Sequence, residues 1–196
     1  MFTKTAIIAA LVGLSSATPA KRFTNYFEAD ILAGGTHIQH GSIRASGERL
    51  FINKEAAAYC EPELIDCSTV SNATTFVYNP ATTGINLNVL SPGGQAVYVT
   101  NTGELGYTRP HSIAIPELAK IQGFQYTPQL ADGTVGSLTF ENQGFDACPT
   151  GEQSNLGQDV YQLFARSVAG HTGCIAVTVA TGGYTGLPAW AFKEKN

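Results

Sequence analysis

The chain has 196 residues, of which 43% are hydrophobic and only 13% are charged, and its formal net charge is -4. This size and apolar content suit one globular domain with its own core, while the scarcity of charge excludes a coiled coil and most disordered chains. The acidic balance also argues against a nucleic-acid partner, because a phosphate backbone is bound by a basic face.

The N-terminus has the pattern of an export signal. Lys4 supplies one positive charge, an apolar run covers residues 6–14, and small residues follow as far as Ala17. Because the run is too short to span a bilayer, it predicts a signal peptide over residues 1–17 rather than a membrane helix. A buried N-terminal helix is the alternative.

A dibasic pair follows the predicted signal peptide. Because Lys21-Arg22 resembles the cleavage site of a dibasic processing protease, we interpret residues 18–22 as a short propeptide removed by cutting after Arg22, and an ordinary exposed charge pair is the alternative. The mature chain would then be one domain over residues 23–196. No second long apolar stretch follows in the sequence, so we expect a secreted protein, extracellular or in the cell wall, without a membrane anchor.

Short segments in which apolar and polar residues alternate recur along the mature chain. Ile85, Leu87 and Val89 alternate with asparagines. This gives the segment one apolar face and one polar face, as in an antiparallel strand with one buried and one solvated side. Turn residues then follow at 91–94 and at 101–103. The predicted strands are residues 27–32, 49–52, 75–78, 85–90, 96–100, 104–107, 137–140, 160–165 and 174–179.

Helical patterns are confined to two short segments, residues 55–59 and 115–120. Many short strands without a regular alternation of strands and helices predict an all-β fold. We therefore predict a single-domain antiparallel β-sandwich or barrel with short connecting helices. A β-trefoil is the alternative.

The four cysteines are expected to form disulfides, because an exported protein matures in an oxidising compartment. Short sequence separations favour pairing Cys60 with Cys67 and Cys148 with Cys174, and the cross pairings stay open. A metal site is disfavoured because the sequence has no CxxC pair.

The sequon Asn72-Ala73-Thr74 lies in a polar stretch after Cys67. It predicts N-glycosylation of Asn72 on a surface loop.

Residues that could carry catalysis do not form a recognisable motif. The sequence contains no G-x-S-x-G elbow, and the histidines, among them His37, His40 and His171, can be combined with hydroxyl residues into many notional triads. His37 and His40 also lack a third metal ligand at a recognisable spacing. We predict no catalytic residue, no metal and no cofactor.

Aromatic residues on a β-rich exported body are candidates for carbohydrate contact, because an aromatic face can stack on the apolar face of a sugar. The candidates are Tyr98, Tyr107 and Trp190. Packing in the core is the alternative for each, since tyrosine is common in strands.

An ordered series of segments resembles the fungal PhiA-type cell-wall proteins, also described as the IgE-binding protein family. The segments are 91–99, 105–108, His111-Ser112, Ala147-Cys148-Pro149, 161–164 with Cys174, and a stretch between residues 35 and 46. Phe145 and Asn101 depart from the pattern, where a tryptophan and an acidic residue are expected.

The resemblance implies a secreted or wall-associated fungal protein linked to phialide and conidium development and recognised by antibodies as an allergen. It implies no catalytic residue, and it supports the Cys148–Cys174 pair. We therefore expect a non-enzymatic cell-wall or extracellular protein, with cell-wall polysaccharide as a candidate partner. A secreted carbohydrate- or protein-binding module or effector is the first alternative, and a secreted hydrolase is the second.

Overall fold

The computed structural model describes residues 25–168 and 170–193, so the predicted signal peptide and propeptide, with Ala17 and Arg22, lie outside the described residues. The described residues form strands and one 3-10 helix, η1 (Cys67–Thr69). The strands are β1 (Tyr26–Leu32), β2 (Ile43–Ser46), β3 (Arg49–Ile52), β4 (Ala58–Tyr59), β5 (Phe76–Asn79), β6 (Gly84–Leu87), β7 (Gln95–Val99), β8 (Leu105–Tyr107), β9 (Phe124–Thr127), β10 (Gly136–Phe140), β11 (Phe145–Gln153), β12 (Asp159–Ala165), β13 (Ile175–Gly183) and β14 (Ala191–Phe192).

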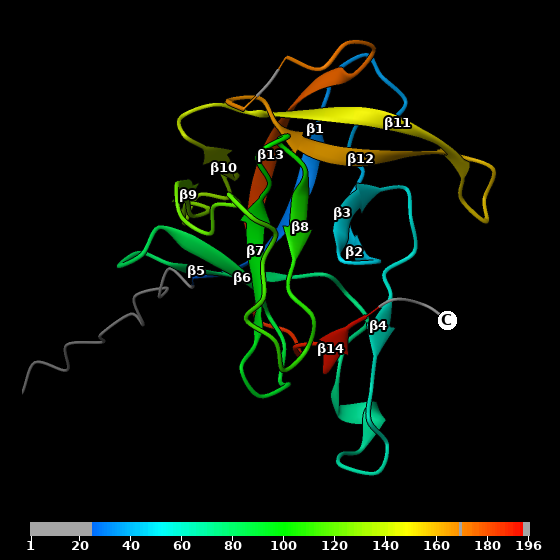
Figure 1. Cartoon of the computed structure of the whole chain (residues 1–196), viewed down its shortest axis with the longest axis vertical. Helices are drawn as coiled ribbons and strands as arrows, with labels where there is room; N and C mark the ends of the chain where they lie inside the picture. Colours follow the sequence, from blue (N-terminus) through cyan, green and yellow to red (C-terminus); the bar gives the residue numbers. More distant parts are fainter. Residues whose placement is uncertain (1–24, 169, 194–196) are drawn as a thin grey trace, which may run out of the picture.

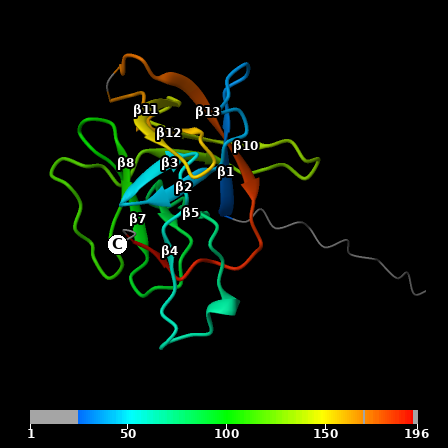
Figure 2. The same cartoon turned by 90° about the vertical axis from the view of Figure 1, so that its right-hand side faces the viewer.

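One large antiparallel sheet contains most of these strands. Its order is β1-β5-β6-β7-β8-β3-β12-β11-β13-β10-β9, with β2 paired to β3. Because β13 also pairs with β1, the sheet closes partly into a ring. In Figure 1, β11 and β12 run across one end of the molecule, while the separate β4–β14 sheet lies toward the other end. Figure 2 shows β3 beside β12, the strand with which it pairs.

The core fills the inside of this partly closed sheet, because successive residues of a strand point to opposite faces. In β3, Leu50 and Ile52 belong to the buried core. Arg49 and Phe51 alternate with them and so point to the outer face of the sheet. The same alternation in the neighbouring strands gives this part of the sheet an outer face of mixed aromatic and polar residues.

The all-β, single-domain antiparallel prediction is confirmed, but both predicted connecting helices are wrong. Residues 55–59 contain strand β4, in which Tyr59 pairs with Ala191, so backbone pairing with a distant segment prevails over local helical preference. Residues 115–120 form an irregular loop in which Leu118 has a positive φ of 61°. Ile115 and Leu118 are exposed there, so one turn of helix would lack the packing that stabilises short helices.

A β-trefoil consists of three repeated units. The strand order of the described residues shows no such repeat, so the structure does not support the β-trefoil alternative. In the part of the chain that the structure describes, no helix is long and apolar enough for a membrane span.

Two disulfides are present, with the pairing that the short sequence separations favour. Cys60 pairs with Cys67, which lies 7 residues further along, and staples the loop between β4 and η1. Cys148 of β11 pairs with Cys174, 26 residues further along and directly before β13. The second disulfide therefore cross-links two neighbouring strands of the large sheet.

Loop length predicts unequal contributions of the disulfides to stability. By the chain-entropy relation, a closed loop of 26 residues is worth about 3.5 kcal/mol and a loop of 7 residues about 2.4 kcal/mol. Replacing Cys148 and Cys174 by Ser should therefore lower the free energy of unfolding more than the same change at Cys60 and Cys67. Denaturant unfolding of the two double variants measures the difference, and an equal or reversed order would contradict this account.

Gly136 lies at a position where adding one methyl group is expected to disrupt the sheet. A Cβ atom at Gly136 would lie 1.9 Å from the backbone oxygen of Thr127 and 2.4 Å from Thr181 Oγ1. Gly136→Ala should cost at least about 1–3 kcal/mol, because this overpacking can be relieved only by backbone movement. Gly34→Ala is the matched control, since a Cβ there meets nothing within 4 Å. Thermal unfolding tests the pair, and equal melting temperatures would refute the predicted clash.

Candidate functional site

The pairing of β3, β7, β8, β11 and β12 gathers side chains distant in sequence on one outer face of the sheet. Residues opposite one another on paired antiparallel strands share a face. The register gives three adjacent rows: Tyr98–Gly106–Arg49, Phe51–Gln162–Cys148 and Glu104–Phe164–Asp146.

The first hollow on this face has a volume of about 520 Å³, within the usual range for ligand pockets of about 300–1,000 Å³. Tyr98 and Phe51 supply aromatic rings to its lining. Three carboxylates and three cations also line it, and they lie in pairs: Arg49 Nη2 is 3.6 Å from Glu104 Oε2, Lys54 Nζ is 2.7 Å from Glu152 Oε2, and Arg109 pairs with Glu48. The hollow is therefore polar but carries no excess of either charge.

Tyr98 lies flat over Gly106 of the neighbouring strand. A Cβ atom at Gly106 would be 2.5 Å from a carbon of the Tyr98 ring, so only glycine leaves room for this arrangement. Burial raises the pKa of the Tyr98 hydroxyl, and Glu48 and Glu104 raise it further against the opposing effect of Arg49. The hydroxyl therefore remains protonated and available as a hydrogen-bond donor at neutral pH.

A strained turn places Glu48 at the rim of the first hollow. Gly47 and Glu48 connect β2 to β3, with φ of 55° and 62°. Two-residue hairpin loops of type I′ need positive φ at both positions, and a side chain at such a position is strained. The carbonyl of Glu48 accepts a 3.0 Å hydrogen bond from the Tyr107 N–H, which holds the turn against β8.

A second hollow of about 310 Å³ adjoins the first, and Arg49, Phe51 and Glu152 line both. Gln162 and Phe164 of β12 line the second hollow, together with Cys148. We refer to the two hollows together as the sheet-face groove.

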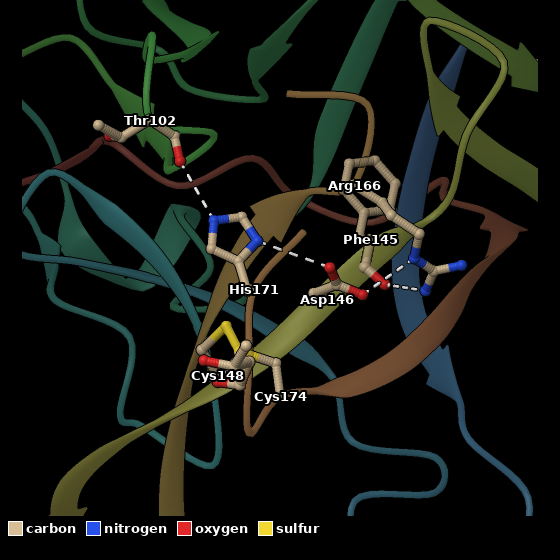
Figure 3. Close-up of polar contacts among 8 residues, drawn as sticks. Thr102, Phe145, Asp146, Cys148, Arg166, His171 and Cys174 are labelled. Carbon is tan, nitrogen blue, oxygen red and sulfur yellow. Dashed lines mark hydrogen bonds and ion pairs between the residues drawn. A yellow bond between two sulfur atoms is a disulfide. The ribbon is translucent and has the colours of Figure 1, made fainter. Parts of the chain in front are cut away.

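A cluster of charged groups contacts Phe164, which lines the second hollow, and Figure 3 shows the contacts within this cluster. Arg166 donates to Asp146 Oδ1 over 2.9 Å and to the Phe145 carbonyl over 2.6 Å. His171 lies between two acceptors: its Nε2 donates to the Thr102 carbonyl over 3.2 Å, and its Nδ1 is 3.6 Å from Asp146 Oδ2. The cluster thus holds the loop before β13 against β11 and against the turn between β7 and β8.

This cluster also supports the floor of the second hollow. The His171 ring lies 4.5 Å, centroid to centroid, from the Phe164 ring. The Cys148–Cys174 disulfide anchors the same loop from its other side, as Figure 3 shows. Phe164 is therefore held between the sheet and a cross-linked loop.

The histidines are engaged in contacts other than a catalytic triad. His171 Nε2 donates to the Thr102 carbonyl, and its Nδ1 is 3.6 Å from Asp146 Oδ2 without a hydrogen-bond partner among the described residues, so neither nitrogen contacts a serine hydroxyl. His37 Nε2 lies 2.7 Å from the Tyr161 hydroxyl, and His40 contacts Gln39. Among residues 25–168 and 170–193, no group of three or more His, Cys, Asp or Glu side chains is placed to hold a metal ion.

The three aromatic candidates lie in different surroundings. Tyr98 lines the first hollow. The prediction for Tyr107 is wrong: it points from β8 into the core and is 0% exposed, and burial raises the pKa of its hydroxyl well above the usual value. Its alternation with Gly106 explains this, because neighbours on a strand face opposite sides. Trp190 is partly buried beside β14 and lines neither hollow of the groove.

Sequence reasoning missed Arg49, Phe51, Gln162 and Phe164. A signal for the last two was present, because Tyr161, Leu163 and Ala165 alternate with them and are core residues. The pairing that joins Gln162 to Phe51 across 111 positions has no local signal.

Asn72 is exposed, as the predicted surface loop requires, and lines a separate hollow of about 530 Å³ with Arg44 and Lys54. Thr74 of the same sequon is buried, and its Oγ1 accepts a 2.9 Å hydrogen bond from the Ala45 N–H. The threonine hydroxyl is thus part of the folded structure, so any glycan on Asn72 would have to be added before folding is complete.

The sequon therefore predicts two separable effects in secreted protein. Asn72→Gln should remove one N-glycan, seen as a loss in intact mass, with little change in stability. Thr74→Val should remove the same glycan and also cost about 1–3 kcal/mol in the free energy of unfolding, because it leaves the Ala45 N–H unpaired. A mass of Asn72→Gln that differs from wild type only by the added methylene group, or equal stability of the two variants, would count against this prediction.

Comparison with known proteins gives one consistent result. A family model described as PhiA-like secreted protein matches residues 27–193. An uncharacterized secreted protein of Arthroderma benhamiae is 34% identical over 137 residues, which are 67% of this chain and 63% of that relative. The chain thus covers less than two thirds of that relative's length. No solved structure matches the chain.

Proposed function

Because the chain belongs to the PhiA-like secreted protein family, we propose that it is a non-catalytic protein of the fungal cell wall that binds a neutral polysaccharide through the sheet-face groove. The family is one of secreted proteins, and the two disulfides agree with an extracellular location. The observation that carries the proposal is the lining of the groove, in which aromatic rings lie among mutually paired charges.

The lining favours a neutral sugar polymer over a charged ligand. A phosphate- or sulfate-rich ligand would need cations without partners, whereas Arg49 and Lys54 each lie beside a carboxylate. A polyhydroxyl ligand can use the paired groups as donors and acceptors without disturbing their balance. Tyr98 and Phe51, which are 8% and 6% exposed, each contribute a small aromatic surface to the lining against which a sugar ring can pack. The same pairing supports the expectation that nucleic acid is not a partner.

The engagement of His171 and His37 by other groups supports a role without catalysis. The two adjoining hollows of about 520 and 310 Å³ could take neighbouring units of a polymer. These features also serve the alternative of a secreted effector that captures soluble glycans, since the same contacts would be made.

Two finer roles rest on the family resemblance. We propose that the protein takes part in phialide and conidium development and that it is recognised by IgE antibodies as an allergen. Deletion of its gene with counting of conidia, and binding of patient IgE to the purified protein, would test these roles separately.

The binding proposal predicts the outcome of a pull-down with insoluble glucan, chitin and mannan. Wild-type protein with intact disulfides should bind at least one polymer saturably, and the matching soluble oligosaccharide should displace it. Tyr98→Ala should weaken binding at least about tenfold, or about 1.4 kcal/mol, because it removes an aromatic face from the first hollow.

Tyr184→Ala is the control variant, because it removes another tyrosine ring that lines neither hollow of the groove. It should bind like wild type. No saturable binding to any of the polymers would refute the proposal. Loss of binding in Trp190→Ala but not in Tyr98→Ala would move the site to the C-terminal segment and contradict the groove assignment.

A further inference from the structure

We propose that the second hollow of the sheet-face groove is a subsite for the acetamido group of an N-acetylated sugar, so that the groove prefers N-acetylhexosamine polymers to plain glucans. This inference rests on the proposed polysaccharide-binding function and names the class of sugar. It starts from Gln162, a polar side chain whose position the fold does not explain.

Gln162 is 7% exposed and lies on β12 between Phe51 of β3 and Cys148 of β11. Its side-chain Nε2 is buried and has no hydrogen-bond partner among the described residues. Buried polar groups in folded proteins are nearly always paired, since an unpaired one forfeits its bonds to water. An unpaired amide in the lining of a hollow therefore points to a ligand that completes it.

The surroundings of Gln162 define the chemistry of that ligand. One part of the lining of the second hollow is apolar and consists of the Phe51 and Phe164 rings, Pro149 and Cys148 of the disulfide, while Arg49, Thr150 and Glu152 with Gln162 make the rest polar. A group that fits must combine a hydrogen-bonding atom with a small apolar end.

An acetamido group has this combination. Its carbonyl oxygen can accept from Gln162 Nε2 once the side-chain amide turns that buried nitrogen toward the hollow, while its methyl group would lie against Phe164 and Pro149. An acetamido group also carries an N–H. In the other orientation of the Gln162 side-chain amide, this N–H can donate to Gln162 Oε1. A sugar hydroxyl could satisfy the same nitrogen but would leave the apolar walls without a contact.

The second hollow is placed to receive a substituent of a sugar ring that is bound in the first hollow. Arg49, Phe51 and Glu152 line both hollows, so a ring against Tyr98 and Phe51 would lie beside the second hollow. The Glu152 carboxylate, which already accepts from Lys54 Nζ over 2.7 Å, lies at this junction. It can accept a hydrogen bond from the acetamido N–H.

Calorimetric titration of full-length secreted protein tests the inference with three soluble hexamers. These are the β-1,4-linked oligomers of N-acetylglucosamine, of glucose and of glucosamine, the last of which lacks the acetyl groups and carries partly protonated amines in their place. We expect wild type to bind the N-acetylglucosamine hexamer at least about tenfold more tightly than the other two. Gln162→Leu should lose at least about tenfold for that hexamer and change less than about twofold for the glucose hexamer.

Gln158→Leu is the control variant, because Gln158 is exposed and lies outside the groove; it should bind like wild type. Gln162→Leu should keep or raise the melting temperature, since it removes a buried unpaired group, and a marked fall would overturn the assignment by showing a structural bond. Equal binding of all three hexamers, or equal weakening of all three by Gln162→Leu, would overturn this inference but leave the proposed function standing. Absence of binding to every hexamer and to every insoluble polymer would overturn both.

Discussion

The alternation of inward and outward residues on β12 is the constraint on which the rest of the site depends. Leu163 and Ala165 are fully buried in the core, and this burial fixes the register of the strand, because a slip by one residue would turn its apolar set to solvent. Gln162 and Phe164 are thereby forced onto the outer face. The pairing of β12 with β3 and β11 then places Phe51 and Cys148 beside them.

The outer face so formed is unusual in its balance of charge. Each cation of the first hollow lies beside a carboxylate, for example Arg49 beside Glu104 and Lys54 beside Glu152. Exposed ion pairs of this kind add little stability, typically 0–1 kcal/mol each. Their more important consequence is a polar surface without net charge around aromatic rings, which is the character expected of a site for neutral sugars.

The sequence predicts the strands that carry their own alternating pattern, and it fails where the determinant is distant. β6, β10 and β12 lie where their apolar residues alternate. β11 was not predicted, because Pro149 and Gly151 interrupt its strand pattern. β4 was not predicted either, because it forms through its pairing with the distant β14. Of the candidate site, Tyr98 was identified because tyrosine itself carries the signal. Gln162 was not, because its unpaired amide exists only after β3 and β11 have assembled around it.

The central claim is that the outer face around Tyr98 and Gln162 binds neutral sugar. Titration of ¹⁵N-labelled protein with soluble wall oligosaccharides, followed by amide chemical shifts, tests it most directly. The account predicts saturable shifts that concentrate on β3, β7, β8 and β12, with Gly106 among the largest because the Tyr98 ring lies over it. Shifts confined to the segment around Trp190, or none with any oligosaccharide, would contradict it.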